Sequence, residues 1–143
     1  MKYLRSFLVI ALLFSLLGSM IYSADAQAAT RNKTNQEMKD VADPIMDNIL
    51  EGVNLDDYIA YSKDFDQALK VLGARTKFFQ VSRYLKKTMG NYMYREYMGS
   101  LQKDNLVVVL WKATFDKSQE DVLIKLFLTK ENNRYVVKGL RFQ

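Results

Sequence analysis

The spacing of apolar residues along this chain changes once, near Gly90. Before this point, apolar residues recur every third and fourth position, which is the spacing of an amphipathic helix. After it they alternate with a period of two, which is typical of strands. Residues 105–115 form the clearest strand, because the run is β-branched, apolar on both alternating faces and bounded by polar residues, as in the middle of a sheet. Helices followed by strands predict an α+β fold.

The strongest helical pattern lies in the first half of the chain. Thr34 and Glu37 have the spacing of a capping box, and the apolar stripe that follows consists of Met38, Val41, Ala42, Ile45, Met46, Ile49, Leu50 and Val53. The opposite face, expected to be solvated, carries Asp40, Asp43, Asp47 and Glu51. Pro44 predicts either a bend or a restart of the helix with Asp43 as its cap, and Gly52 predicts its end.

Three shorter helices are predicted before the strands begin. We expect one after Asn54 that carries Tyr58, a second between Asp66 and Gly73, and a third from about Arg75 to Gly90. Each prediction depends on a capping side chain at the start or on a glycine at the end.

The second half predicts four strands, over residues 92–101, 105–115, 122–130 and 134–142. Short connections between them, with Asn132-Asn133 as a two-residue turn, predict an antiparallel meander. We therefore expect N-terminal helices packed on a curved four-stranded antiparallel sheet. The central strand presents Val107, Val109, Trp111 and Phe115 to one face and Leu106, Val108 and Leu110 to the other. Helices can cover one face only, so the other is a candidate surface for a homodimer.

The N-terminus has the order of a secretory signal peptide. Lys2 and Arg5 precede an apolar run over residues 7–17, and Ala26-Gln27-Ala28 forms a cleavage box. We expect a signal peptide over residues 1–28, cleavage near Ala28, a polar tether over residues 29–35 and one domain over residues 36–143, located outside the cell or in the periplasm and envelope. The alternative is an uncleaved membrane anchor, the one route by which we expect membrane contact.

The residue types present in the chain limit the catalytic mechanisms and metal sites that it can have. The chain has no histidine and no cysteine, which excludes Ser-His-Asp catalysis, thiol nucleophiles and standard zinc sites. Acidic residues could in principle bind calcium, but their spacing fits a solvated helix face and a plain turn better. We expect neither a metal nor a cofactor.

Charge is distributed unevenly. Residues 34–66 contain nine acidic residues and two basic ones, Lys39 and Lys63, whereas residues 67–143 contain fifteen basic and six acidic residues. One interpretation is an acidic helical layer attracted to a basic sheet. The other is a basic surface for an anionic envelope polymer or lipid head groups.

Aromatic residues are abundant, with nine tyrosines, eight phenylalanines and one tryptophan. Most are expected in the core, and no recognition motif points to nucleic acid. The functional interpretation is an apolar pocket between helices and sheet. Its candidate lining residues are Tyr58, Phe79, Tyr94, Trp111 and Phe127.

Three stretches carry a family resemblance: NLDDYIAYSKDFD at residues 54–66, RTKFFQVSRYLKKTMGNY at 75–92 and NNRYVVKGLRFQ at 132–143. In this order, after an amphipathic helix, they resemble small exported bacterial domains of the nuclear-transport-factor-2-like, or cystatin-like, superfamily. The resemblance implies a cone-shaped sheet around helices, a pocket at the open end and frequent dimerisation through the sheet. Members include ketosteroid isomerases, which use a carboxylate base with tyrosine and aspartic acid donors, and non-catalytic binding domains.

The leading expectation is an exported, non-enzymatic binding domain for an apolar ligand or an envelope protein. The alternatives are a small pocket enzyme that transfers protons through Asp and Tyr, and a membrane-anchored envelope component. A carboxylate that points into the apolar cavity beside a tyrosine hydroxyl would favour the enzyme.

Overall fold

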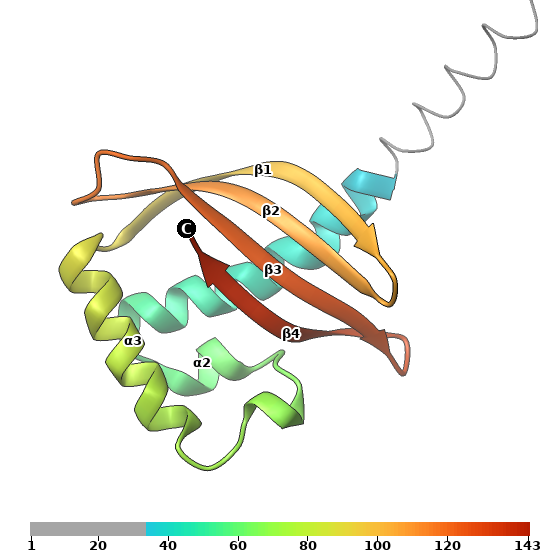
Figure 1. Cartoon of the computed structure of the whole chain (residues 1–143), viewed down its shortest axis with the longest axis horizontal. Helices are drawn as coiled ribbons and strands as arrows, with labels where there is room; N and C mark the ends of the chain where they lie inside the picture. Colours follow the sequence, from blue (N-terminus) through green and yellow to red (C-terminus); the bar gives the residue numbers. More distant parts are fainter. Residues whose placement is uncertain (1–33) are drawn as a thin grey trace, which may run out of the picture. The chain divides into compact units, whose positions relative to one another are not determined.

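The computed structural model describes residues 34–143, of which Glu37–Gln143 form one compact unit. The expected signal peptide, its cleavage box and the first part of the expected tether lie outside the described residues. The elements are a long helix over residues 34–55, α2 (Tyr58–Ser62), the 3-10 turn η1 (Gln67–Leu69), α3 (Ala74–Thr88), β1 (Tyr92–Lys103), β2 (Leu106–Phe115), β3 (Val122–Glu131) and β4 (Arg134–Phe142). The fold is therefore α+β, with helices and one open four-stranded antiparallel sheet (Figure 1).

The sheet is the predicted meander, in the order β1-β2-β3-β4. Asn132 and Asn133 join β3 to β4 with φ values of 47° and 62°, the positive values that a tight hairpin turn requires and asparagine tolerates. On β2, Trp111 lies opposite Tyr97 of β1 and Ile124 of β3. The tryptophan is therefore in the middle of the sheet, as the apolar run predicts.

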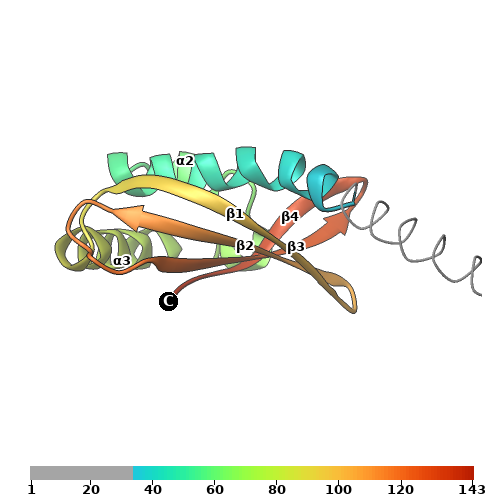
Figure 2. The same ribbon diagram turned by 90° about the horizontal axis from the view of Figure 1, so that it is seen from above.

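The long helix runs along one face of the sheet (Figure 2). Its apolar stripe and the alternate residues of the strands form the main core, which comprises Met38, Ala42, Ile45, Met46, Ile49, Leu50, Phe65, Val107, Val109, Trp111, Ala113, Phe115, Val122, Ile124, Leu126, Leu128 and Val137. Burial of each large apolar side chain stabilises the fold by about 1.5–3 kcal/mol. A smaller cluster, built on Val53, Phe78 and Leu85, fixes α3 to the end of the long helix.

The long helix differs from the prediction in three places. Residues 34 and 35 are helical and not a tether. Pro44 is exposed and does not interrupt the helix, so no restart occurs. Gly52 lies inside the helix and is buried, because α2 crosses close to it: a Cβ at Gly52 would lie 2.5 Å from the backbone nitrogen of Tyr61. The glycine is needed for close approach and does not end the helix.

The short elements also differ in detail. The cap of α2 is Asp57 and not Asn54, since the Asp57 carboxylate accepts a hydrogen bond from the Ile59 N–H at 2.8 Å. The segment after Asp66 forms only the 3-10 turn η1, although Asp66 caps it as predicted. Helix α3 begins directly after Gly73, which has a φ of 86°.

The two edge strands of the sheet, β1 and β4, differ in what pairs with their outer sides. Beside β4, Phe65 forms a parallel bridge with Val137, in which the Val137 N–H donates to the Asp64 carbonyl at 2.8 Å and the Asp66 N–H donates to the Val137 carbonyl at 3.0 Å. Among the described strands, β1 pairs only with β2. At the β4 edge the chain thus pairs with itself beside Val137, whereas no described strand pairs with the outer side of β1.

Candidate functional site

An apolar cleft of about 330 Å³ opens between α2, α3 and β4. Its lining residues are Tyr58, Tyr61, Phe65, Leu69, Ala74, Lys77, Phe78, Val81, Gly139 and Leu140. The volume lies at the lower end of the range of about 300–1,000 Å³ that ligand pockets occupy. The cleft can therefore hold a small organic molecule or an apolar side chain of another protein.

Four packed aromatic rings give the cleft its shape. The ring centroid of Tyr61 lies 4.5 Å from that of Phe78 and 4.8 Å from that of Phe65, and the rings of Tyr58 and Phe78 are 5.7 Å apart. The tilted contacts are those that aromatic pairs prefer. Because these rings contact one another, the wall of the cleft is formed before any ligand binds.

Local structure fixes each of these rings. The cap at Asp57 and the close contact at Gly52 place α2, which carries Tyr58 and Tyr61. The bridge to β4 holds Phe65. Phe78 is one of the buried residues that pack α3 against the end of the long helix. The cleft thus depends on contacts between three segments that are separate in the sequence.

The cleft has one charged lining residue, Lys77, and no carboxylate. None of the ion pairs within residues 34–143 involves Lys77, which is exposed. Burial, with a smaller effect from Tyr58, raises the pKa of Tyr61 to about 12. The Tyr61 hydroxyl is therefore protonated at neutral pH and can donate a hydrogen bond, but it does not ionise there.

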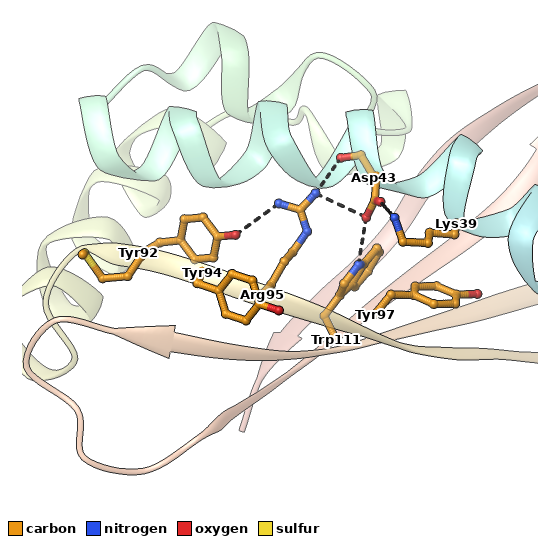
Figure 3. Close-up of a pocket in the computed structure, with 8 residues that line it drawn as sticks. Lys39, Asp43, Tyr92, Tyr94, Arg95, Tyr97 and Trp111 are labelled. Atoms are coloured by element: carbon orange, nitrogen blue, oxygen red, sulfur yellow. Dashed lines mark hydrogen bonds and ion pairs between the residues drawn. The ribbon is translucent and has the colours of Figure 1, made fainter.

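A second, polar pocket of about 200 Å³ lies between the long helix and strands β1 and β2 (Figure 3). Asp43 from the helix is at its centre. Its Oδ1 accepts hydrogen bonds from Trp111 Nε1 at 3.0 Å and from Arg95 Nη2 at 3.3 Å, and its Oδ2 accepts one from Lys39 Nζ at 2.5 Å. Both carboxylate oxygens therefore have partners.

Arg95 of β1 connects the sheet to the helix in the same pocket. Its Nη1 donates to Asp47 Oδ1 at 2.7 Å and to the Tyr92 hydroxyl at 3.3 Å, and its Nη2 also donates to the Asp43 carbonyl oxygen at 3.2 Å. Its guanidinium carbon lies 5.9 Å from the centroid of the Trp111 ring. The Arg95 side chain is only 12% exposed, so this network joins the two layers of the fold at a largely desolvated position.

The charges and hydrogen bonds around Asp43 indicate that its carboxylate holds the long helix to the sheet. Burial opposes ionisation of its carboxyl, but hydrogen bonds from Lys39 and Trp111 and the charge of Arg95 outweigh burial and lower the pKa of Asp43 below its ordinary value. A general base is most effective with a pKa near the working pH. Asp43 is thus a permanently ionised hydrogen-bond acceptor at neutral pH and a weak base.

The structure does not bring the five candidate lining residues into one pocket. Tyr58 lines the apolar cleft, whereas Tyr94 and the fully buried Trp111 line the polar pocket. Phe79 lines a separate hollow of about 500 Å³ beside α3. Phe127 alternates with core residues of β3 and lies on the face of the sheet away from the long helix, where Arg141 stacks on it. A role for these residues in ligand binding stays a prediction.

Sequence reasoning missed the two central residues of the polar pocket. Periodicity places Asp43 on the solvated face, but it lies three residues before Met46 and seven before Leu50, both buried. Residues at those spacings share a side of the helix, so Asp43 borders the apolar stripe. Its position beside the apolar stripe is therefore the sequence feature that could have placed Asp43 near the sheet. The residues next to Arg95 in the sequence give no comparable indication of its contact with Asp43.

No group of three or more acidic side chains within residues 34–143 is arranged to hold a metal ion. Over the same residues, no helix has both the length and the apolar character needed to cross a membrane.

The chain matches no protein-family model, no curated protein and no solved structure. Its function must therefore be inferred from its own residues and their geometry.

Proposed function

We propose that this protein is an exported, non-enzymatic binding domain whose apolar cleft holds a small amphipathic molecule with an apolar body and one acidic group. The observation that carries the proposal is the preformed aromatic wall of the cleft between α2, α3 and β4, with Lys77 as its single charged lining residue. Concave apolar sites with a few polar groups are the usual form of small-molecule sites.

Exposed apolar residues around the cleft support binding. Leu69 and Val81 line it and are partly exposed. Apolar side chains gathered at a surface mark a site of interaction more often than singly scattered ones. An apolar ligand that enters the cleft would remove part of this surface from water.

The charge of Lys77 determines the expected polarity of the ligand. Lys77 is one of the lining residues and has no ion-pair partner among residues 34–143. A carboxylate or sulfonate at one end of the ligand would pair with it, while the rest of the ligand contacts the rings. A neutral ligand of the same size would lack this interaction.

The positions of the carboxylates favour binding over proton transfer. The cleft has no carboxylate to serve as a base beside Tyr61. In the polar pocket, Asp43 does lie near tyrosines, but its lowered pKa and its three hydrogen-bond donors make it a weak base. These observations support the proposed non-enzymatic binding domain over the alternative of a small pocket enzyme.

The cone-like arrangement and the export of the protein are also parts of this proposal. A cone-like, nuclear-transport-factor-2-like arrangement is supported by the long helix against one face of the meander and by the open cleft at its end. Export is supported by the N-terminal sequence pattern. Determination of the N-terminal sequence of the protein from its own host tests this point, since a start near Ala29 is expected and a start at Met1 would indicate an anchored form.

Ligand binding is tested by displacement of 8-anilinonaphthalene-1-sulfonate, followed by its fluorescence, with decanoate and decanol as competitors. We expect saturable binding of one molecule per chain and at least tenfold weaker binding after Val81→Gln. The matched control is Val41→Gln, another partly exposed helical valine, which is expected to leave binding unchanged. Lys77→Ala should weaken decanoate and leave decanol unaffected.

Two results would contradict the proposal. Equal effects of the two valine substitutions would show that the probe binds surface apolar residues without using the cleft. Absence of binding by a folded protein would exclude the small-molecule ligand. Retention of an envelope protein, with no small molecule, in native mass spectrometry of protein purified from its host would favour the protein partner.

A further inference from the structure

The connection between η1 and α3 presents two adjacent apolar side chains to solvent. Leu72 is 104% exposed and Val71 is 62% exposed. Figure 1 shows this connection as the green loop that projects away from the sheet. A side chain that is fully exposed adds little to the stability of the fold. Packing within the chain therefore does not explain why a leucine lies here.

The backbone holds these side chains in a defined turn. The Ala74 N–H donates a hydrogen bond to the Val71 carbonyl oxygen at 3.0 Å, which closes a four-residue turn. Gly73 has a φ of 86° and a ψ of −9°, the values of the third residue in a type II β-turn. Leu72 is the second residue, at the corner of this turn. The apolar tip is thus presented by an ordered segment that leads directly into α3.

Basic residues flank the turn, and acidic residues do not. Residues 67–95 contain seven basic residues and no aspartate or glutamate. The three basic residues nearest the turn in sequence are Lys70, which is partly exposed, and the exposed Arg75 and Lys77. None of them forms an ion pair within the described part of the chain. Asp66, the nearest acidic residue before the turn, already pairs with a lysine of β4. The turn therefore combines an apolar tip with uncompensated positive charge.

We propose that this turn docks on the surface of an anionic lipid bilayer. Val71 and Leu72 enter the boundary between the head groups and the acyl chains. The ammonium and guanidinium groups of Lys70, Arg75 and Lys77 pair with the lipid phosphates. Binding at a membrane surface depends on the apolar area that is buried and on the attraction between basic residues and anionic lipids, and the turn with its flanking residues supplies both.

A bilayer suits this surface better than another protein does. A stable protein interface buries about 800 Å² on each partner, and two side chains at a projecting turn provide only a small part of that area. A bilayer needs no complementary shape, because lipids rearrange around the group that enters. Apolar side chains that bind at the interface enter about 5–10 Å into the head-group boundary, a depth that side chains at the corner of a turn can reach.

Docking through this turn also brings the apolar cleft to the bilayer. Leu69 and Ala74, which lie just before and just after residues 70–73, both line the cleft. A ligand with an apolar body and one acidic group collects in the same head-group boundary, so the cleft of a docked protein faces its source. Docking itself does not depend on that ligand, because residues 70–73 do not line the cleft. The ligand assay contains no vesicles, so either proposal can fail without the other.

A fluorescent label at the turn tests insertion in the full-length chain. The chain has no cysteine, so Leu72→Cys provides a single site for a nitrobenzoxadiazole label. The matched control is Leu55→Cys, because Leu55 is 69% exposed and precedes Asp56, which pairs with Lys86 in the last turn of α3. The control label therefore lies roughly 20 Å from the turn along the helix.

The expected signal is local to the turn. On vesicles of phosphatidylcholine and phosphatidylglycerol, we expect the label at position 72 to shift its emission to the blue and to be quenched by lipids that carry a doxyl group on the acyl chain. The label at position 55 should show neither change. Attachment of the chain through its apolar N-terminal segment would not produce this difference between the two positions. A label at position 72 that stays in water on these vesicles would overturn the proposal and would leave a protein as the occupant of the turn.

Charge substitutions test the electrostatic part in the chain labelled at position 72. Lys70→Gln with Arg75→Gln should lower the ratio of inserted to free turns at least tenfold, since each basic residue near an anionic membrane contributes about fivefold. Lys87→Gln with Lys117→Gln is the matched control. It removes the same charge at the other end of α3, where the Lys117 N–H donates to the Met89 carbonyl oxygen, and at that distance salt screens most of the attraction.

The lipid composition provides the last comparison. Vesicles of phosphatidylcholine alone should reduce insertion of the label at position 72 at least tenfold. Circular dichroism checks that each variant is folded. Equal effects of the two pairs of substitutions, or insertion that does not depend on phosphatidylglycerol, would overturn the proposal.

Discussion

Removal of the Asp43 carboxylate tests whether the polar pocket holds the helix to the sheet. In Asp43→Ala, Trp111 Nε1 loses its acceptor at 3.0 Å while the indole remains fully buried. Arg95 loses one carboxylate but keeps Asp47 and the Asp43 carbonyl oxygen, which the backbone still supplies. The effect should therefore come mainly from a buried donor without a partner.

The expected magnitude follows from these contacts. A buried donor that loses its partner costs about 1–3 kcal/mol, and the partial loss of a partner for Arg95 adds about 1 kcal/mol, so Asp43→Ala should reduce the free energy of unfolding by about 2–4 kcal/mol. Asp47→Ala is the matched control, because it removes another carboxylate from Arg95 but at a side chain that is 64% exposed. We expect it to cost less than about 1 kcal/mol.

Urea denaturation followed by far-ultraviolet circular dichroism measures both changes in the free energy of unfolding. A double-mutant cycle then shows how much of the Asp43→Ala effect comes from the Trp111–Asp43 contact. Trp111→Phe removes the N–H and keeps an aromatic ring, so Asp43→Ala in that background should cost about 1–2 kcal/mol less than in the wild type. Unchanged slopes against urea would show that the denatured state is not altered. Equal costs for Asp43→Ala and Asp47→Ala, or a cycle that is simply additive, would refute the role assigned to the Trp111–Asp43 contact.

Three further predictions concern the core, a glycine and acid. Trp111→Ala should lower the free energy of unfolding by about 3–5 kcal/mol, as truncation of a buried aromatic does; a change near zero in urea denaturation would contradict its place in the core. Gly52→Ala should lower the free energy of unfolding by an amount at the upper end of about 1–3 kcal/mol, because the new Cβ would meet backbone atoms of α2. Gly73 has a positive φ but open space around it, so Gly73→Ala should lower the same free energy by only about 1–2 kcal/mol. Thermal unfolding in which Gly73→Ala is the more destabilising of the two would count against the close contact at Gly52. The hydrogen bond from Lys138 lowers the pKa of Asp66 below its ordinary value of 3.8. The ionised Asp66 carboxylate therefore stabilises the fold above pH 3.8, and this stabilisation is lost as the pH falls through the lower pKa of the folded state. Asp66→Asn keeps a capping side chain and should reduce the loss of stability in acid, as measured by an acid titration followed by circular dichroism.

Local patterns were enough to predict most of the fold. The change of period near Gly90 located the boundary between helices and sheet, and the run around Trp111 located the central strand. Asn132-Asn133 predicted the last hairpin, because two asparagines tolerate the positive φ that the turn needs. These signals are carried by residues near each other in sequence, so they can be read without the tertiary structure.

The sites depended on contacts between distant segments. Asp43 looked solvated because periodicity describes one helix, and its partner Trp111 is 68 residues away. The segment after Asp66 looked like a helix, but the bridge between Phe65 and Val137 holds its start against β4, and only the turn η1 forms there. The cleft itself is formed by α2, α3 and β4, none of which has a pocket alone.

The sequence by itself determined most of the helices, the four strands and the order of the meander, because short-range backbone preferences and burial set them. The tertiary structure alone decided that Asp43 holds the long helix to the sheet and that Gly52 is a point of close approach. The physical reason is that each of these depends on which side chain or backbone atom of another element lies within a few ångströms, and packing of the helices on the sheet sets that distance.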